Sequence, residues 1–184
     1  SPPDSAAAGR AGAAPPSAYP GSSAPSPPAA SGGAADPAGL TGAYLPEFAQ
    51  VENAASAFAG CTGLERVRLS GLAAGSTANV SSLLAGAGAE GSSFELSDIA
   101  SAAPSADASS LMAGAHAETL TASAIGCGAS ANLTSAFADC AQLESADIRM
   151  AGTGAGADAT ALMSGGAALA DVAMEKVASG QNAN

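Results

Sequence analysis

Large apolar residues are sparse in this chain, and from residue 58 onward they return at nearly constant intervals. Phe58 is followed by Leu84, Met112, Phe137 and Met163, at steps of 26, 28, 25 and 26 residues. A period in the twenties is typical of solenoid proteins, in which each repeat forms one coil. The spacing therefore predicts about five stacked coils, with these five residues in one column of the core.

The residues that follow each of these anchors also repeat. Six positions after an anchor stand Leu64, Leu143 and Leu169. The segments "LERVRL" and "LESADI" place apolar residues at i, i+3 and i+5, and the last two alternate with polar residues as in a half-buried strand. The second copy reaches the same place one residue later, at Phe94 and Leu96, whereas the register of the third copy, "HAETLTASAIGCG", stays open.

Between the expected strands, each copy carries a short segment that opens with Asn or Asp. "ANVSSLL", "ADASSLM", "ANLTSAF" and "ADATALM" space their apolar residues three and four apart, as one helical turn does. The Asn or Asp stands where a short helix is capped. We therefore expect an α/β solenoid, each coil containing a short strand, a bend and one or two helical turns. Such coils bury a core only by stacking.

The same composition leaves a second fold open. Ala-rich segments have a high helix propensity, and "ADATALMSGGAALADVAMEKVAS" also reads as a helix interrupted at Gly165 and Gly166. An all-α, Ala-rich helical bundle is therefore the alternative to the solenoid.

Composition divides the chain into parts. Residues 1–38 hold nine of the eleven prolines and no Leu, Ile, Val or Phe. Such a segment cannot bury enough apolar surface to offset its conformational entropy. We expect residues 1–38 to be a disordered Pro/Ala/Ser-rich tether, residues 39–178 the solenoid, and residues 179–184 a disordered tail.

The net charge of −11 narrows the classes of partner. Nucleic acids and anionic membranes both require clustered Lys and Arg, which this chain lacks. No segment approaches the roughly 20 consecutive apolar residues of a membrane span. We therefore expect neither nucleic acid nor a membrane span, and we read a chain that opens on Ser1 as a mature form or a fragment.

The phrases "ANVSSLLAG" and "FAGCTGLERVRL" resemble the BspA-like repeat of bacterial and protist surface proteins, a relative of leucine-rich repeats. In that repeat an Asn-Val-Thr segment leads to Met-Phe, then to Gly-Cys, and then to Leu at strand spacing. The resemblance extends over roughly residues 40–175. It implies a right-handed, leucine-rich-repeat-like solenoid in an extracellular or cell-surface protein, usually without enzymatic activity.

One glycine motif in the chain is typical of a cofactor-binding site. Gly152, Gly154 and Gly156 in "MAGTGAGADAT" have the spacing of a dinucleotide fingerprint, but they occupy the turn of the repeat, so we expect no cofactor.

Cys61 and Cys140 stand in equivalent slots three coils apart, about 14 Å at the usual strand spacing, which is too far for a disulfide. Together with Cys127, which differs in phase, they are expected to be small interior thiols.

Asn79 and Asn132 each open an Asn-X-Ser/Thr sequon and also stand at the capping position of the repeat. They are therefore interpreted as caps that bond the following turn, with N-glycosylation as the alternative. His116 has no Cys, Ser or acidic partners arranged for a metal site or a triad, so it is expected at a surface turn. We predict no catalytic or metal-binding residues, and hence a protein that is not an enzyme.

Arg66 and Arg68 flank Val67 and should point outward together, and Asp147 and Arg149 occupy the corresponding part of the fourth copy. These four residues predict a mixed-charge patch on the outer face of the strands, where solenoids usually bind. The predicted function is recognition of a protein or glycan partner through this face. The alternative is a structural spacer, or an assembly component of a larger surface protein with no partner of its own.

Overall fold

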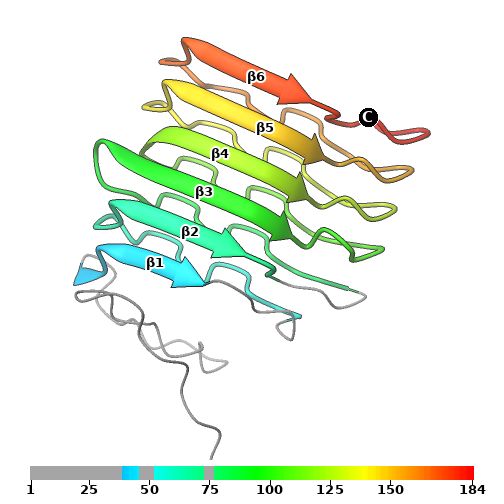
Figure 1. The fold of residues 1–184 in the computed structure, drawn as a ribbon, viewed down its shortest axis with the longest axis horizontal. Coiled ribbons are helices and arrows are strands. Elements are labelled where there is room, and N and C mark those ends of the chain that lie inside the picture. Colours follow the sequence, from blue (N-terminus) through cyan, green and yellow to red (C-terminus); the bar gives the residue numbers. More distant parts are fainter. Residues whose placement is uncertain (1–38, 46–51, 73–76) are drawn as a thin grey trace, which may run out of the picture.

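The strands of this protein form a single parallel sheet in chain order, as Figure 1 shows. The computed structural model describes residues 39–45, 52–72 and 77–184, so the expected tether at 1–38 lies outside the described residues. The strands are β1 (Gly42–Leu45), β2 (Arg66–Ser70), β3 (Ser92–Ile99), β4 (Ala117–Ile125), β5 (Ser145–Ala151) and β6 (Asp171–Glu175).

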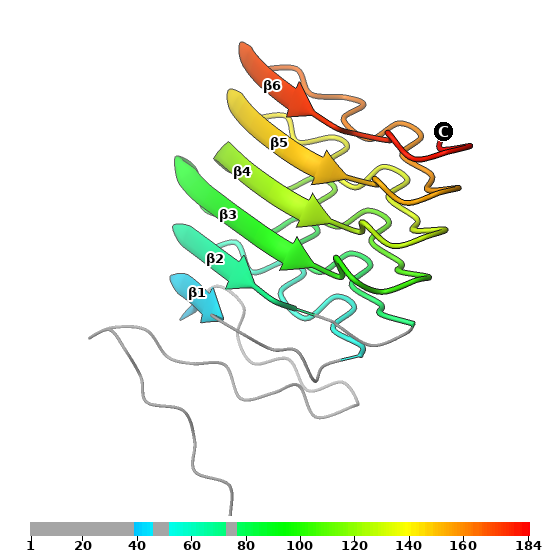
Figure 2. The same ribbon diagram turned by 45° about the vertical axis from the view of Figure 1, so that its right-hand side comes forward.

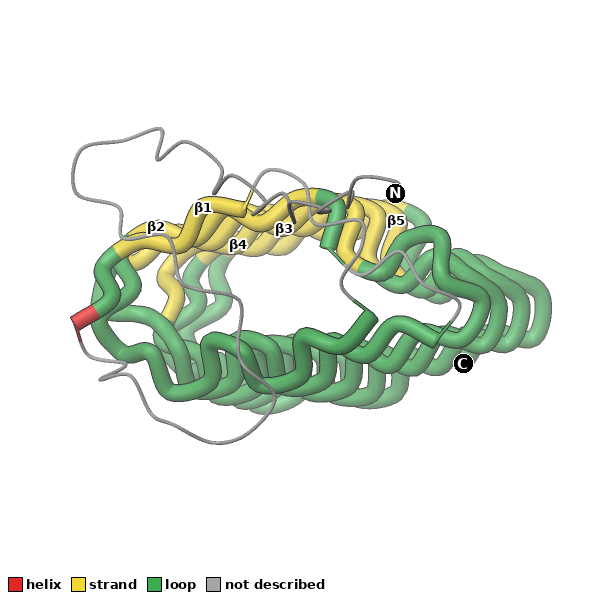
Figure 3. Tube along the Cα trace, turned by 90° about the horizontal axis from the view of Figure 1, so that it is seen from below, coloured by secondary structure: helices red, strands yellow, loops and turns green. Residues whose placement is uncertain are grey.

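Each strand pairs in parallel with the next strand of the sequence, so every connection is a complete coil. The view along the stack in Figure 3 places the strands on one side of the coil and the loop segments on the other, and Figure 2 shows the coils rising in order. The solenoid predicted from the residue spacing is confirmed.

Two rows of inward-facing side chains run from β2 to β6 and form most of the strand side of the core. The rows are Val67, Phe94, Leu120, Ala146 and Val172, and Leu69, Leu96, Ala122, Ile148 and Met174. The pairing of β3 with β4 fixes the register that the sequence left open in the third copy, with Leu120 beside Phe94. One irregularity, between Ser92 and Ser93, brings the strands into register.

The five predicted anchors form one column on the opposite side of the coil. The backbone N–H of Phe58 donates to Leu83 O at 2.9 Å, and that of Leu84 to Leu111 O at 2.8 Å. Met112 and Phe137 repeat this bond one and two coils further on. Phe58, Leu84, Met112 and Phe137 are buried, and Met163, in the last coil, packs half-buried against the same core. The predicted column is confirmed.

The return segments are not helical, which corrects one detail of the predicted coil. The described residues contain no α-helix. Instead, the third residue after each Asn or Asp has a left-handed backbone, with φ between 52° and 57°, at Ser56, Ser82, Ser110, Ser135 and Ala161. Left-handed residues interrupt an α-helix, so the apolar spacing of three and four reflects consecutive tight turns.

Hydrogen bonding explains why these turns replace a helix. The N–H groups of the return segment alternate: that of Ser56 donates to Ser81 O in the next coil, whereas that of Ala57 closes a turn on Ala54 O. A helix would direct both bonds within its own coil. Because half of the bonds instead join neighbouring coils, the return side forms a second ladder, and the all-α alternative is wrong.

The glycines of "GTGAG" form the turn that follows β5, as the repeat predicted. Gly152 and Gly156 have positive φ values of 61° and 72°. A Cβ on Gly154 would overlap the backbone carbonyl of Gly128 in the coil before. Glycine is therefore required here by close packing between coils, and the carbonyl of Gly128 occupies the space beside Gly154 that the fingerprint would leave for a ligand.

Residues 179–184 do not form the predicted disordered tail. Gly156 N–H donates to Gln181 O at 2.8 Å, and Ala159 N–H donates to Asn184 O at 2.7 Å. Ala183 and Asn184 repeat the Ala-Asn/Asp pair that opens the return segments at Asn79, Asp107, Asn132 and Asp158. These residues therefore begin a sixth turn of the solenoid on top of the fifth.

Candidate functional site

The outer face of the sheet, here called the strand face, consists of three rows of mostly polar side chains. By strand pairing, the rows are Gly42, Arg66, Ser93, Thr119, Ser145 and Asp171; Tyr44, Arg68, Glu95, Thr121, Asp147 and Ala173; and Ser70, Ser97, Ser123, Arg149 and Glu175. All of these residues are exposed or half-buried. The alternation of buried and exposed residues along each strand produces this arrangement, since successive side chains point to opposite faces.

One ion pair on this face joins β2 and β3. Arg68 stands directly beside Glu95 in the ladder, and Arg68 Nε donates to Glu95 Oε2 at 2.6 Å. Both side chains remain about half exposed, at 59% and 48%. A pair this exposed contributes at most about 1 kcal/mol to stability, so its main effect is to fix where the two charges are displayed.

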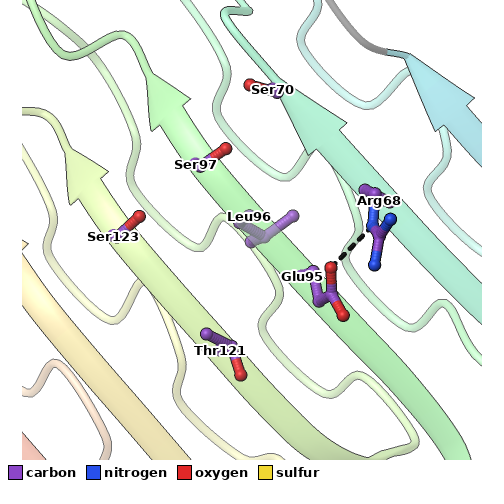
Figure 4. Close-up of a pocket in the computed structure, with 7 residues that line it drawn as sticks. All are labelled: Arg68, Ser70, Glu95, Leu96, Ser97, Thr121 and Ser123. Carbon is purple, nitrogen blue, oxygen red and sulfur yellow. Dashed lines mark hydrogen bonds and ion pairs between the residues drawn. The ribbon is translucent and has the colours of Figure 1, made fainter.

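A shallow depression adjoins this ion pair. Its volume is about 330 Å³, and Figure 4 shows the side chains around it on β2, β3 and β4. Its lining residues are Arg68, Ser70, Glu95, Leu96, Ser97, Thr121 and Ser123. Ser70, Ser97 and Ser123 form one row with a hydroxyl from each strand, so the depression combines two opposite charges with several donors and acceptors.

The second ion pair lies within β5. Arg149 donates two hydrogen bonds to Asp147, from Nε to Oδ1 and from Nη2 to Oδ2, each at 2.9 Å. The two residues are two apart on one strand, which places their side chains on the same face. The hydrogen bonds and charge of Asp147 raise the pKa of Arg149 above its ordinary value.

A second depression lies at the edge of the sheet beside this pair. Its volume is about 510 Å³, and its lining residues are Asp147, Arg149, Val172, Ala173, Met174 and Glu175. It joins the strand face to the exposed apolar residues of the last strand.

The four charged residues predicted from sequence therefore lie on the strand face, but not in one cluster. Arg66 and Arg68 are on β2, and Asp147 and Arg149 are on β5, three strands away. Three strand spacings amount to about 14 Å. The strands between carry Glu95 on β3 and several hydroxyl side chains, among them Thr119, whose Oγ1 donates to Ser93 Oγ at 2.9 Å.

Sequence reasoning missed Glu95, the partner of Arg68. The sequence placed Phe94 and Leu96 in the slots of Val67 and Leu69, but the residue between them was given no role. The signal that could have found it is its position between Phe94 and Leu96, because a residue between two inward apolar residues must face outward. With that register, Glu95 falls beside Arg68.

The Asn and Asp residues that open the return segments stack into a second regular feature, here called the Asx ladder. Its members are Asn53, Asn79, Asp107, Asn132 and Asp158. Each Oδ1 accepts the backbone N–H two residues on, at 2.9–3.1 Å. Asn79 and Asn132 therefore bond the turn that follows them, as the capping interpretation predicted, and glycosylation of these sequons stays a prediction.

Hydrogen bonds also affect the Asp158 carboxylate of the ladder. The side-chain and backbone hydrogen bonds of Thr160 hold the pKa of Asp158 below its ordinary value of 3.8. The ladder also bonds between coils, since Asn132 Nδ2 donates to Asp107 Oδ1 at 3.5 Å. Asn and Asp play the same structural part here, but only Asp brings charge.

The cysteines and the histidine lie apart from one another. All three thiols are free, with Cys61 and Cys140 buried in equivalent slots and Cys127 half-buried. Burial raises the pKa of Cys140 to about 11 and also raises that of Cys61, which keeps both thiols protonated at neutral pH. His116 is exposed just before β4, with Nδ1 3.3 Å from Gly88 O.

Within residues 39–45, 52–72 and 77–184, no group of three or more His, Cys, Asp or Glu side chains could hold a metal ion. The same ranges contain no helix with the length and apolar character needed to cross a membrane.

Comparison of the chain with family models, with curated protein sequences and with solved structures gave no match.

Proposed function

We propose that this chain is a non-enzymatic recognition module that binds a protein or glycan partner through the strand face. The observation that supports this most directly is the depression beside Arg68 and Glu95, where charged groups and hydroxyls from three strands converge on an exposed surface. The resemblance to BspA-like repeats favours an extracellular or cell-surface location.

The rigidity of the sheet supports a binding role. Side chains on a hydrogen-bonded sheet are held in a fixed array before a partner arrives, so less conformational entropy is lost on binding. The two ion pairs fix the positions of two positive and two negative charges on that array. Fixed charge patterns of this kind contribute to specificity and to the association rate more than to affinity.

The titratable groups support binding over catalysis. Burial keeps the Cys61 and Cys140 thiols protonated, which disfavours them as nucleophiles. His116 faces a backbone carbonyl at 3.3 Å, an arrangement that gives it no nucleophile to activate. We therefore propose no catalytic residues for this chain.

Charge-swap variants test the proposal. The pair Arg68→Glu with Glu95→Arg, and the pair Arg149→Asp with Asp147→Arg, each keep an ion pair and the net charge but reverse the charge layout. We expect binding to a glycan array or to cell-surface proteins to fall at least about tenfold in one of the two variants, since reversed charges oppose those of the partner.

Glu90→Lys provides the control for this experiment, because Glu90 is exposed in the turn before β3, outside the strand face. This control changes the net charge, which the swaps do not. Binding that the control preserves and a swap removes supports the strand face. Binding that survives both swaps would contradict it.

The alternative function, a structural spacer or assembly component, is favoured by a different observation. On β4, between the two ion pairs, the residues of the three strand-face rows are Thr119, Thr121 and Ser123, which offer no large aromatic or Arg anchor of the kind that dominates protein interfaces. If the wild-type chain bound nothing in the same assay, the spacer would be the better account.

A further inference from the structure

The last coil leaves both inward rows of the core uncovered. Val172 and Met174 continue the rows of Ala146 and Ile148, yet they are 48% and 49% exposed, whereas Ala146 and Ile148 are 2% and 0% exposed. The difference arises because each coil is covered by the coil that follows it. At β6 the apolar rows reach the surface, together with the half-buried Met163 and Leu169.

The backbone of β6 also has a strand beside it on one side only. Among the described residues β6 is an edge strand of the sheet, and its pairing is with β5 alone. An edge strand presents a row of N–H and C=O groups that can pair with another strand. Terminal coils of solenoids generally need a polar cap, and β6 carries apolar residues at the positions that a cap would make polar.

The geometry of the coil continues beyond β6 without change. Asn184 N–H donates to Ala157 O at 2.9 Å and Asn184 O accepts from Ala159 N–H, so Asn184 stands beside Asp158 in the Asx ladder. Gly180 stands against Gly154 as Gly154 stands against Gly128, each with a carbonyl where a Cβ would lie. Both ladders are therefore open for one more layer in the same register.

We propose that this end, called here the C-terminal face and formed by β6 with Met163 and Leu169, is the acceptor surface for one more coil of the same repeat geometry. The strand of that coil would pair in parallel with β6 and place apolar side chains in the rows of Val172 and Met174. Its return segment would accept every second N–H of the last return segment, as each coil does for the one before it.

Continuity with the interfaces inside the molecule identifies this occupant. The pairs β2–β3, β3–β4, β4–β5 and β5–β6 all join through parallel pairing in the same register, and so the same row positions are covered each time. An unrelated partner would have to match two ladders on opposite sides of the coil at once. A coil of this repeat matches both by construction.

An appended coil tests the proposal on the full chain. A copy of residues 133–158 is added directly after Asn184, which then takes the place that Asn132 holds in the original. We expect amide hydrogen exchange in β6 to slow by at least about tenfold, because the edge strand becomes an internal one. Protection of β3 and β4, unchanged from the parent chain, shows in the same experiment that the solenoid is folded.

A matched variant provides the control. In the appended copy alone, the residues that correspond to Leu143 and Ile148, both buried in the original, are replaced by Asp. We expect β6 in this variant to exchange as fast as in the parent. The proposal is overturned if the unaltered copy leaves β6 unprotected while β3 and β4 stay protected, or if the Asp-bearing copy protects β6 equally well.

Discussion

Left-handed backbone conformations recur at equivalent places in successive coils of the described residues, and they limit which residue types fit there. After β3, β4, β5 and β6, respectively, Ala100, Gly126, Gly152 and Ala178 share a position with φ between 46° and 61°. An Ala at such a position costs roughly 1–2 kcal/mol relative to a right-handed conformation. Alanine is present at Ala100 and Ala178 in spite of this cost. Glycine is present at Gly126, where a Cβ would come within 3.2 Å of Leu133.

Asp158 is expected to make the stability of the protein depend on pH in the acid range. Its folded pKa is lowered, so its contribution to stability is present above the unfolded value of 3.8 and is lost as pH falls through the folded pKa. Asp158→Asn keeps the acceptor for the Thr160 N–H but cannot titrate. We therefore expect this variant to lose less of its thermal unfolding midpoint than the parent between neutral pH and about pH 2.5.

Asp158→Ala is the control, since it removes the acceptor at every pH and should lower the midpoint under both conditions. An identical acid dependence in Asp158→Asn and the parent chain would show that Asp158 does not contribute to acid unfolding.

The Asx ladder shows how repeated elements restrict one another. Along the ladder Asp107 and Asp158 are each flanked by Asn, and Asn132 separates them. Adjacent carboxylates about 4.8 Å apart would repel by roughly 1 kcal/mol even at the dielectric constant of water. The alternation of Asn with Asp therefore supplies the same backbone acceptor in every coil without a stack of like charges.

Asn132→Asp tests this account at the element scale, because it places three carboxylates in consecutive coils. We expect the free energy of unfolding to fall by about 1–2 kcal/mol at neutral pH. The loss should diminish at high salt, which screens exposed charges. Urea denaturation at low and high ionic strength provides the measurement.

Asn53→Asp is the matched substitution, since its ladder neighbour among the described residues is Asn79. It should change stability little, as the new carboxylate has no charged neighbour in the ladder. Equal destabilisation by the two substitutions would mean that charge repulsion does not govern the choice between Asn and Asp.

At the scale of the whole molecule, stability is distributed along one axis. Contacts between strands join only sequence neighbours, from β1 to β6. In such a quasi-one-dimensional structure each coil depends on the coils beside it, so an end with an uncovered face opens most easily. The strands β3 and β4 are covered on both sides and carry fully buried Phe94 and Ile125.

Hydrogen exchange of the unmodified chain measures this gradient. We expect amides of β6 to exchange fastest and those of β3 and β4 slowest, with a difference of at least about tenfold. Uniform protection from β2 to β6 would instead indicate that the coils unfold as one unit, or that the C-terminal face is already covered in solution.

The sequence alone determined the periodic features of this protein. The spacing of Phe58, Leu84, Met112, Phe137 and Met163 predicted the stacked column, and the alternation around Val67 predicted which side chains face outward. These features depend on residue type along the chain, and burial of apolar groups enforces them in any fold with this period.

The tertiary structure decided what depends on contacts between coils. The ion pair of Arg68 with Glu95 forms because β2 and β3 lie side by side in this register, a contact between two residues 27 positions apart in the chain. The turns replaced the predicted helices because half of their N–H groups bond the next coil, and no sequence window contains that partner. Residues 179–184 are ordered for the same reason, since their hydrogen-bond partners lie one full coil earlier in the chain.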